Sequence, residues 1–132
     1  MDKTIIITVV LIVLAGFIFW GFQTGFFAGT SNAVVATPLP AGIVLFYGAE
    51  CPHCKVVEDF ITQNNINAKV KITQLEVWHN ASNAKLLVNV ATKICKITGN
   101  SVGVPFLYDG NGKCYIGETD VPNFLKAQAG IK

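Results

Sequence analysis

One stretch decides the fold of this chain: Gly42-Ile-Val-Leu-Phe-Tyr-Gly-Ala-Glu-Cys-Pro-His-Cys-Lys55. Residues 42–47 are a continuous apolar run rich in β-branched and aromatic side chains, which is typical of a strand covered on both faces. Residues 52–64 have apolar side chains at helical spacing and begin with a proline, whose missing N–H is not needed in a first turn. Cys51 and Cys54 therefore lie where a buried strand gives way to a helix.

The middle of the chain predicts a second strand and a second helix. Apolar and polar residues alternate over 68–77, which indicates a strand. Residues 83–98 are predicted to form a helix that ends at Gly99, because a glycine is favoured just after a helix end. The apolar stripe expected to face the sheet consists of Ala84, Leu87, Val88, Ala91, Ile94 and Cys95.

The last third predicts a hairpin and a closing helix. Asp109-Gly-Asn-Gly112 is a turn sequence between the strands expected over 104–108 and 113–116. The closing helix is expected to start near Asp120, which can cap it, with Pro122 in the first turn. The order β-α-β-α-β-β-α predicts an α/β fold with a small mixed four-stranded sheet and helices on both faces.

The two cysteines of the first helix are in a setting that suits thiol chemistry. A helix N-terminus favours the thiolate over the thiol at Cys51, and His53 and Lys55 can add positive charge nearby. Pro52 fits the first helical position without loss. Cys54 precedes two apolar positions of the same helix by three and seven residues, so it is expected to face the core while Cys51 stays accessible. An exposed nucleophile and a shielded resolving thiol are what a dithiol catalyst requires.

At these residues the chain resembles the thioredoxin superfamily. The matching segments follow one another in the same order and spacing over nearly all of 42–129: Phe46-Tyr-Gly-Ala-Glu-Cys-Pro-His-Cys-Lys55, Gly103-Val-Pro105 and Gly117. The tetrad Cys-Pro-His-Cys is similar to that of the exported disulfide oxidase DsbA. The compact topology, and Val-Pro followed by Gly-x-x-Asp at 117–120, are more similar to a glutaredoxin.

The resemblance implies roles for individual residues. Cys51 would be the nucleophile, Cys54 the resolving thiol and His53 a side chain that tunes the thiolate. A cis peptide bond is implied between Val104 and Pro105, with Pro105 facing the two cysteines. The backbone of Val104 would then bind an extended substrate.

Two positions depart from the family pattern. Thioredoxin and DsbA carry a buried acid six residues before the first cysteine, and this chain has Leu45 there. Glu50, solvent or no specific base would then take the place of the usual proton acceptor. The second glycine of the glutathione-binding turn of glutaredoxins is Glu118 here, which disfavours an anionic tripeptide as substrate.

Cys95 and Cys114 form a second pair for which the sequence leaves three interpretations. A structural disulfide is favoured outside the cytosol and would add about 2 to 4 kcal/mol of stability. Buried free thiols and a second redox pair that relays electrons are the alternatives. If the hairpin pairs simply, Cys114 lies opposite Leu107.

Composition argues against several other classes of function. The chain contains no arginine, carries a net charge of +2 and has no lysine cluster, so nucleic acid is not an expected partner. Haem attachment requires histidine directly after the second cysteine, where Lys55 stands. Zinc or an iron–sulfur cluster requires further ligands, and Cys95 and Cys114 are no second close pair. No metal or cofactor is therefore expected, and His79 is assigned no role.

The N-terminal third has a composition of its own. No charged residue occurs from residue 4 to residue 49, and an apolar run over 5–22 approaches the length that spans a bilayer. We expect a transmembrane anchor at 1–27, a linker at 28–41 and a thioredoxin-like domain at 42–132. A cleaved secretory signal, cut near Ser31-Asn32-Ala33, is the alternative. The weakly positive flank before the run predicts that the domain faces out of the cytoplasm.

These patterns predict a membrane-anchored, extracytoplasmic thiol:disulfide oxidoreductase that oxidises the thiols of client proteins. Reoxidation by a quinone-linked membrane partner, of the DsbB or vitamin-K-epoxide-reductase type, is implied by the resemblance. A tethered reductase or isomerase is the first alternative. A binding module that uses the fold without catalysis is the second.

Overall fold

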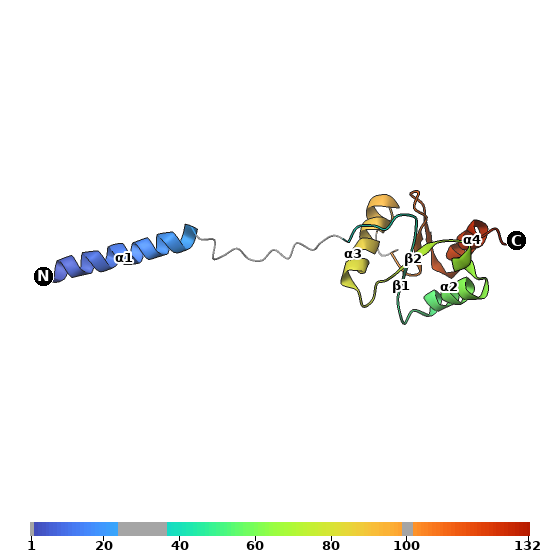
Figure 1. The fold of residues 1–132 in the computed structure, drawn as a ribbon, viewed down its shortest axis with the longest axis horizontal. Helices are drawn as coiled ribbons and strands as arrows, with labels where there is room; N and C mark the ends of the chain where they lie inside the picture. The colour runs from blue at the N-terminus through green and yellow to red at the C-terminus, as the bar shows by residue number, and fades with distance from the viewer. Residues whose placement is uncertain (1, 24–36, 99–101) are drawn as a thin grey trace. The chain divides into compact units, whose positions relative to one another are not determined.

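The computed structural model describes residues 2–23, 37–98 and 102–132 (Figure 1). The chain divides into two units, Met1–Ala33 and Val34–Lys132. Most of the expected linker and its Ser31-Asn32-Ala33 site lie outside the described residues, as does Gly99.

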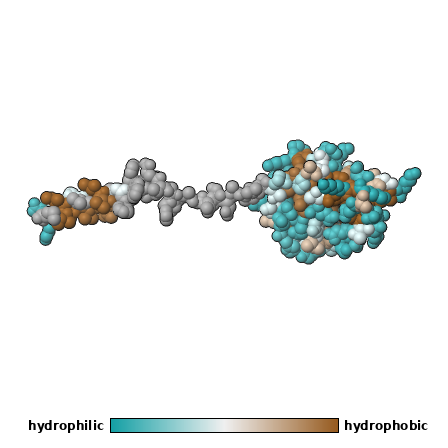
Figure 2. Space-filling model, in the orientation of Figure 1, coloured by the Kyte–Doolittle hydropathy of each residue, from teal (hydrophilic) through white to brown (hydrophobic). Residues whose placement is uncertain are grey.

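The first unit contains one helix, α1 (Lys3–Gln23), of 21 residues. Its described side chains are mostly exposed and apolar, and α1 is largely brown in Figure 2 wherever it is coloured. The hydroxyl of Thr8 donates to the carbonyls of Thr4 (3.1 Å) and Ile5 (2.9 Å). In residues 2–23, 37–98 and 102–132, no helix is both long and apolar enough to cross a membrane.

The second unit is built on a four-stranded mixed sheet, as the sequence predicts. The strands are β1 (Ile43–Tyr47), β2 (Ile72–Glu76), β3 (Phe106–Tyr108) and β4 (Cys114–Ile116). Their spatial order is β2-β1-β3-β4, with β1 parallel to β2 and antiparallel to β3, and β3 antiparallel to β4. The buried strand β1 is therefore central, and its C-terminal end leads directly to the dithiol.

Helices cover both faces of this sheet. One face packs against α2 (Pro52–Gln63) and α4 (Gly117–Gln128) through a core that includes Leu45 and Leu107. The other packs against α3 (Ala81–Asn89) and the π-helix Val90–Ile94 that continues it. Alternation along the central strand explains the division, because neighbouring residues of a strand face opposite sides.

The hairpin register differs from the simple pairing by one residue. Cys114 pairs with Tyr108, and Leu107 pairs with Tyr115. A shift of one residue moves a side chain to the other face of the sheet. Cys114 consequently packs with the α3 core instead of the α2 and α4 core.

Several predicted boundaries are corrected. The second strand starts at Ile72 and not at residue 68, because residues 66–68 form a 3-10 turn. The third starts at Phe106, after the Val104–Pro105 bond. The closing helix starts at Gly117, so Asp120 lies within its first turn and does not cap it, and Pro122 lies inside the helix. The N–H of Gly117 donates to the carbonyl of Pro105 (2.9 Å), which fixes this earlier start.

The apolar stripe of the second long helix is also corrected. Val88 and Ile94 were expected to be buried but are 51% and 37% exposed. Leu86 and Val90 are buried in their place. The π-helix from Val90 has a wider turn, which shifts the facing positions after it and accounts for Ile94. Val88 lies earlier, in α3, where the buried positions are Leu86 and Leu87, so the predicted phase of the stripe was wrong there.

Candidate functional site

Cys51 caps the N-terminus of α2. Its backbone is extended (φ −78°, ψ 115°), and its Sγ accepts a hydrogen bond from the backbone N–H of Cys54 at 3.3 Å. A serine or aspartate oxygen commonly fills this capping position. Here a sulfur atom fills it, so the free N–H groups and the positive end of the helix dipole are directed at the thiol. Cys51 and Cys54 are both free thiols.

The exposure of the two cysteines differs less than predicted. Cys51 is 6% exposed and Cys54 is 1% exposed, so both are buried. Cys54 accepts a long hydrogen bond from the N–H of Gly48 (N···Sγ 3.5 Å). The nucleophile that was expected to stand open at the surface is instead largely covered. Capping explains the difference, because it turns the Cys51 side chain back over the helix.

Cys54 holds its proton strongly. Burial raises the pKa of Cys54 to about 12, and its hydrogen bond with Cys51 acts in the same direction. Leu45, at the position of the family's buried acid, is 1% exposed, and no polar or charged side chain is buried in the described parts of the chain. Glu50 is not directed at Cys54, because its carboxylate contacts His79 Nε2 at 2.7 and 2.9 Å. Glu50 is therefore engaged elsewhere, and no buried carboxylate replaces the missing acid.

Val104 and Pro105 form the wall beside Cys51. The peptide bond between them is cis, as the resemblance implies. The Cys51 thiol lies 3.7 Å from the carbonyl oxygen of Val104, to which it can donate. Cys51 and Val104 are separated by 53 positions in the sequence, so this contact joins two distant segments. A segment after the second long helix thus borders the dithiol at the start of α2.

His53 pairs with a residue that the sequence treated only as a departure. Its Nδ1 lies 2.7 Å from Oε2 of Glu118, in the first turn of α4, and both side chains are exposed. Lys55 contacts Asp59, whose hydrogen bond raises the pKa of that lysine. Each of these two basic side chains therefore has a carboxylate partner. The sequence analysis identified Glu118 only as a departure from the glutathione-binding turn, and its pairing with His53 joins segments 65 positions apart.

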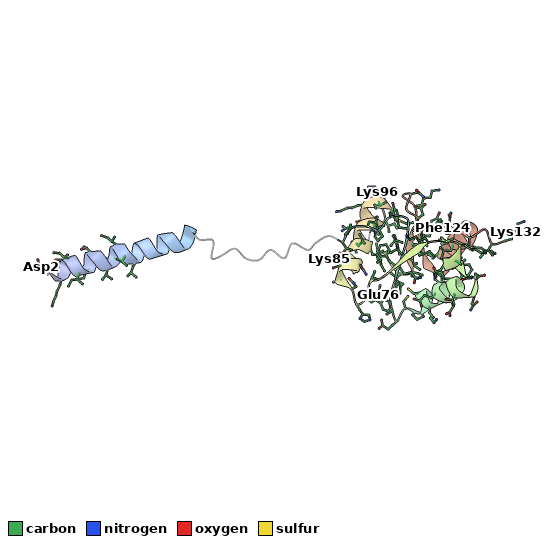
Figure 3. The ribbon with its side chains drawn as sticks, viewed as in Figure 1. Asp2, Glu76, Lys85, Lys96, Phe124 and Lys132 are labelled. Atoms are coloured by element: carbon green, nitrogen blue, oxygen red, sulfur yellow. A yellow bond between two sulfur atoms is a disulfide. The ribbon has the colours of Figure 1, made fainter. Side chains whose placement is uncertain are left out.

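A second loop bordering the site was missed by sequence reasoning. The carboxylate of Glu76, labelled in Figure 3, accepts from the N–H groups of Trp78 (2.7 Å), His79 (2.9 Å) and Ala49 (3.4 Å). Desolvation acts to raise the pKa of Glu76, but these three bonds together hold it below its usual value. The hydrogen bond that the His79 ring makes to the Glu50 carboxylate raises the pKa of His79. His79, which was assigned no role, thus helps join this loop to the residue before Cys51.

Trp78 lies against the backbone of Gly48. A Cβ at residue 48 would overlap the indole ring, so only glycine fits there without a shift. Trp78 is 51% exposed and borders an apolar pocket of about 250 Å³. The pocket is lined by Val77, Trp78, Ala84, Leu87, Val88, Val102, Gly103 and Val104. Because Val104 also contacts Cys51, this pocket adjoins the dithiol.

Cys95 and Cys114 are joined by a disulfide, with their Cα atoms 6.0 Å apart. This finding removes buried free thiols from the three interpretations. Both half-cystines are half-buried and line a pocket of about 340 Å³ together with Ile97, Gly112, Lys113 and Tyr115. In the described residues, no three of the side chains that bind metals gather into a possible metal site.

A crystal structure of wheat glutaredoxin aligns with a TM-score of 0.45 and 19% identity, covering 72% of this chain and 84% of that one. No family model and no curated protein matches the sequence.

Proposed function

We propose that the chain is a thiol:disulfide oxidoreductase that works through Cys51 and Cys54. The observation that carries the proposal is the capping of α2 by the Cys51 sulfur, with a protonated thiol one turn further on. A sulfur atom at a helix N-terminus is stabilised as a thiolate, which is both the better nucleophile and the better leaving group. This arrangement supports exchange at Cys51 and not at Cys54.

The reaction in the oxidising direction starts from the Cys51–Cys54 disulfide. A client thiolate attacks Cys51 Sγ, and Cys54 leaves and takes a proton. A second client thiolate attacks the client sulfur of the mixed disulfide and expels Cys51 as a thiolate. The client loses two electrons and gains a disulfide, while the enzyme becomes a dithiol.

The high pKa of Cys54 limits how fast a mixed disulfide at Cys51 is resolved. Attack of Cys54 on the mixed disulfide is the back reaction, because it returns the client with its thiol reduced. A pKa of about 12 leaves roughly one Cys54 in 100,000 ionised at pH 7, so this back reaction is slow. The mixed disulfide then persists long enough for the second client thiolate to complete the oxidation.

Two single substitutions test the role of the dithiol. Cys54→Ser leaves Cys51 without its resolving partner, so it should accumulate mixed disulfides with client proteins. Cys51→Ser should trap none. Mixed disulfides are counted by non-reducing electrophoresis and mass spectrometry. If neither variant traps a client, the domain is a binding module and the enzymatic proposal is wrong.

The reduction potential tests the direction. A value near that of thioredoxin, about −270 mV, would indicate a reductase, whereas an oxidase should lie well above it. The potential is measured by equilibrating Cys51 and Cys54 with buffers of small thiols and disulfides. An isomerase is distinguished by its ability to rearrange a scrambled client when supplied in the dithiol form.

We further propose that the domain works outside the cytoplasm, held at a membrane by the N-terminal apolar segment. Support comes from the sequence, in which residues 4–49 carry no charge and Lys3 precedes them. A quinone-linked membrane protein would then reoxidise the dithiol. In intact cells, a membrane-impermeant maleimide should label Cys51 after mild reduction. Labelling only after lysis would place the domain on the other side.

A further inference from the structure

The Cys95–Cys114 disulfide packs against the α3 core on one side and borders a surface pocket on the other. Both half-cystines line the pocket of about 340 Å³, and both are half-buried. Thiol–disulfide exchange requires a thiolate to approach one sulfur atom directly, so access limits the reaction. A structural cross-link needs no such opening.

Three lysines flank the two half-cystines. Lys93 and Lys96 lie two residues before and one residue after Cys95, and Lys113 directly precedes Cys114. All three are exposed, and Lys96 is labelled in Figure 3. Lys113 also lines the pocket.

One acid lies close to this group. The carboxylate of Asp109 accepts hydrogen bonds from the N–H groups of Asn111 (2.7 Å) and Lys113 (2.9 Å), which hold it in the hairpin turn. Three lysines within two residues of the half-cystines, against one carboxylate held in the hairpin turn, give this part of the chain a net positive charge. A positive environment stabilises a departing thiolate and attracts an anionic reagent.

The backbone on either side of the bond is suited to opening. Cys95 follows the π-helix, its N–H donating to the carbonyl of Val90 (3.0 Å), and Lys96 after it has φ +57°. Cys114 begins β4, an edge strand of the sheet. Each half-cystine therefore lies at the end of a helix or strand. The two can move apart when the disulfide opens, without disturbing the centre of the sheet.

We propose that Cys95–Cys114 is a second thiol-exchange site, which accepts small thiols that carry a negative charge in addition to the thiolate. The proposal does not rest on the function assigned to Cys51 and Cys54. The pocket admits the sulfur-bearing end of a small molecule, and Lys113 at its wall pairs with the negative group.

The exchange conserves atoms and electrons. The thiolate attacks Sγ of Cys114, a new S–S bond forms, and the bond to Cys95 breaks. Cys95 leaves as a thiolate beside Lys96 and takes a proton from water. A second molecule of the same thiol attacks the sulfur of the first and expels Cys114, so the two small thiols become a disulfide while the protein gains two thiols. A small-molecule disulfide drives the reverse reaction.

The experiment uses the full chain with Cys51→Ser and Cys54→Ser, so that only the second pair reacts. Opening of the disulfide is followed by alkylation and mass spectrometry with 2-mercaptoethanesulfonate, 2-mercaptoethanol or 2-mercaptoethylamine, each at the same thiolate concentration. We expect the sulfonate to react fastest and the amine slowest, with about a tenfold span between them at low salt. Circular dichroism checks that the domain stays folded while the bond opens.

Lys113→Gln and Lys69→Gln form the matched pair of variants. Lys69 is exposed beside the 3-10 turn that packs with α2, on the other face of the sheet. Lys113→Gln should remove most of the preference for the sulfonate, and Lys69→Gln should preserve it. Equal rates for the three thiols, or opening only under conditions that unfold the domain, would overturn the proposal and leave a structural cross-link. The trapping of clients by Cys51 is unaffected by either outcome.

Discussion

The two cysteine pairs of this domain differ in almost every respect. Cys51 and Cys54 are separated by two residues, are free thiols and are buried. The Cys51 sulfur accepts from the backbone N–H of Cys54 and can donate to the Val104 carbonyl. The Cys54 sulfur accepts from the backbone N–H of Gly48. Cys95 and Cys114 are 19 positions apart, are bonded and are half-buried among lysines.

The two pairs differ in which part of the structure determines their properties. The first pair depends on local backbone, because a helix N-terminus acts on the Cys51 sulfur while burial keeps Cys54 protonated. The second pair depends on tertiary structure, because only the hairpin register and the π-helix bring its members together. Accordingly, we expect removal of the second pair to act mainly on stability and changes to the sulfur atoms of the first pair to act mainly on reactivity.

The largest effect should follow removal of the second pair. Closing a loop of this length restricts the unfolded chain, and the chain-entropy relation gives about 3 kcal/mol for the cross-link. Cys95→Ala combined with Cys114→Ala should lower the free energy of unfolding by about that amount, as measured by urea titration. Reactivity of Cys51 toward a small disulfide should be unchanged. Cys51→Ala with Cys54→Ala serves as the control and should lower stability less; a larger loss there would reverse the comparison.

The next effect concerns the pH dependence of the first pair. A thiol attacks only as its thiolate, so a pKa of about 12 makes the rate of attack by Cys54 rise with pH across the whole accessible range. Burial, the largest cause of that pKa, persists when Cys51 is in a mixed disulfide. The release of a chromophoric thiol from Cys51 should therefore accelerate about tenfold per pH unit, or about 100-fold between pH 7 and pH 9. Cys54→Ser should abolish this release, and a plateau below pH 9 would contradict the assigned burial effect.

The sequence predicts the first pair far better than the second. The run Gly42-Ile-Val-Leu-Phe-Tyr47 and the proline after Cys51 determine the strand, the turn and the helix start by local rules, and all three occur as expected. The second pair depends on a one-residue register and on a π-helix, neither of which leaves a periodic signal. The pairing of His53 with Glu118 also joins distant segments, so composition and spacing could not predict it.

A smaller effect on stability should follow substitution of Gly48, whose N–H bonds the Cys54 sulfur. In Gly48→Ala the new Cβ overlaps the Trp78 ring, and the N–H that bonds Cys54 shifts as the chain moves away. Overpacking of this kind costs about 1 to 3 kcal/mol, here near the lower end because the exposed indole can rotate. Thermal unfolding should detect the loss. Trp78→Ala in the same chain should recover part of it, and a strictly additive double variant would exclude the overlap as the cause.

The smallest effect is expected at the exposed pair of His53 and Glu118. The Glu118 carboxylate places a negative charge near the N-terminus of α2, where it opposes the thiolate at Cys51. Glu118→Gln should therefore raise the rate of Cys51 with a neutral disulfide near pH 6.5, by about threefold at most because exposed pairs contribute less than about 1 kcal/mol. Asp120→Asn removes a charge from the same first turn without touching His53 and should change the rate less. Salt should suppress the difference, whereas an effect that persists at about 1 M salt would mean that Glu118 positions the His53 ring instead of acting through its charge.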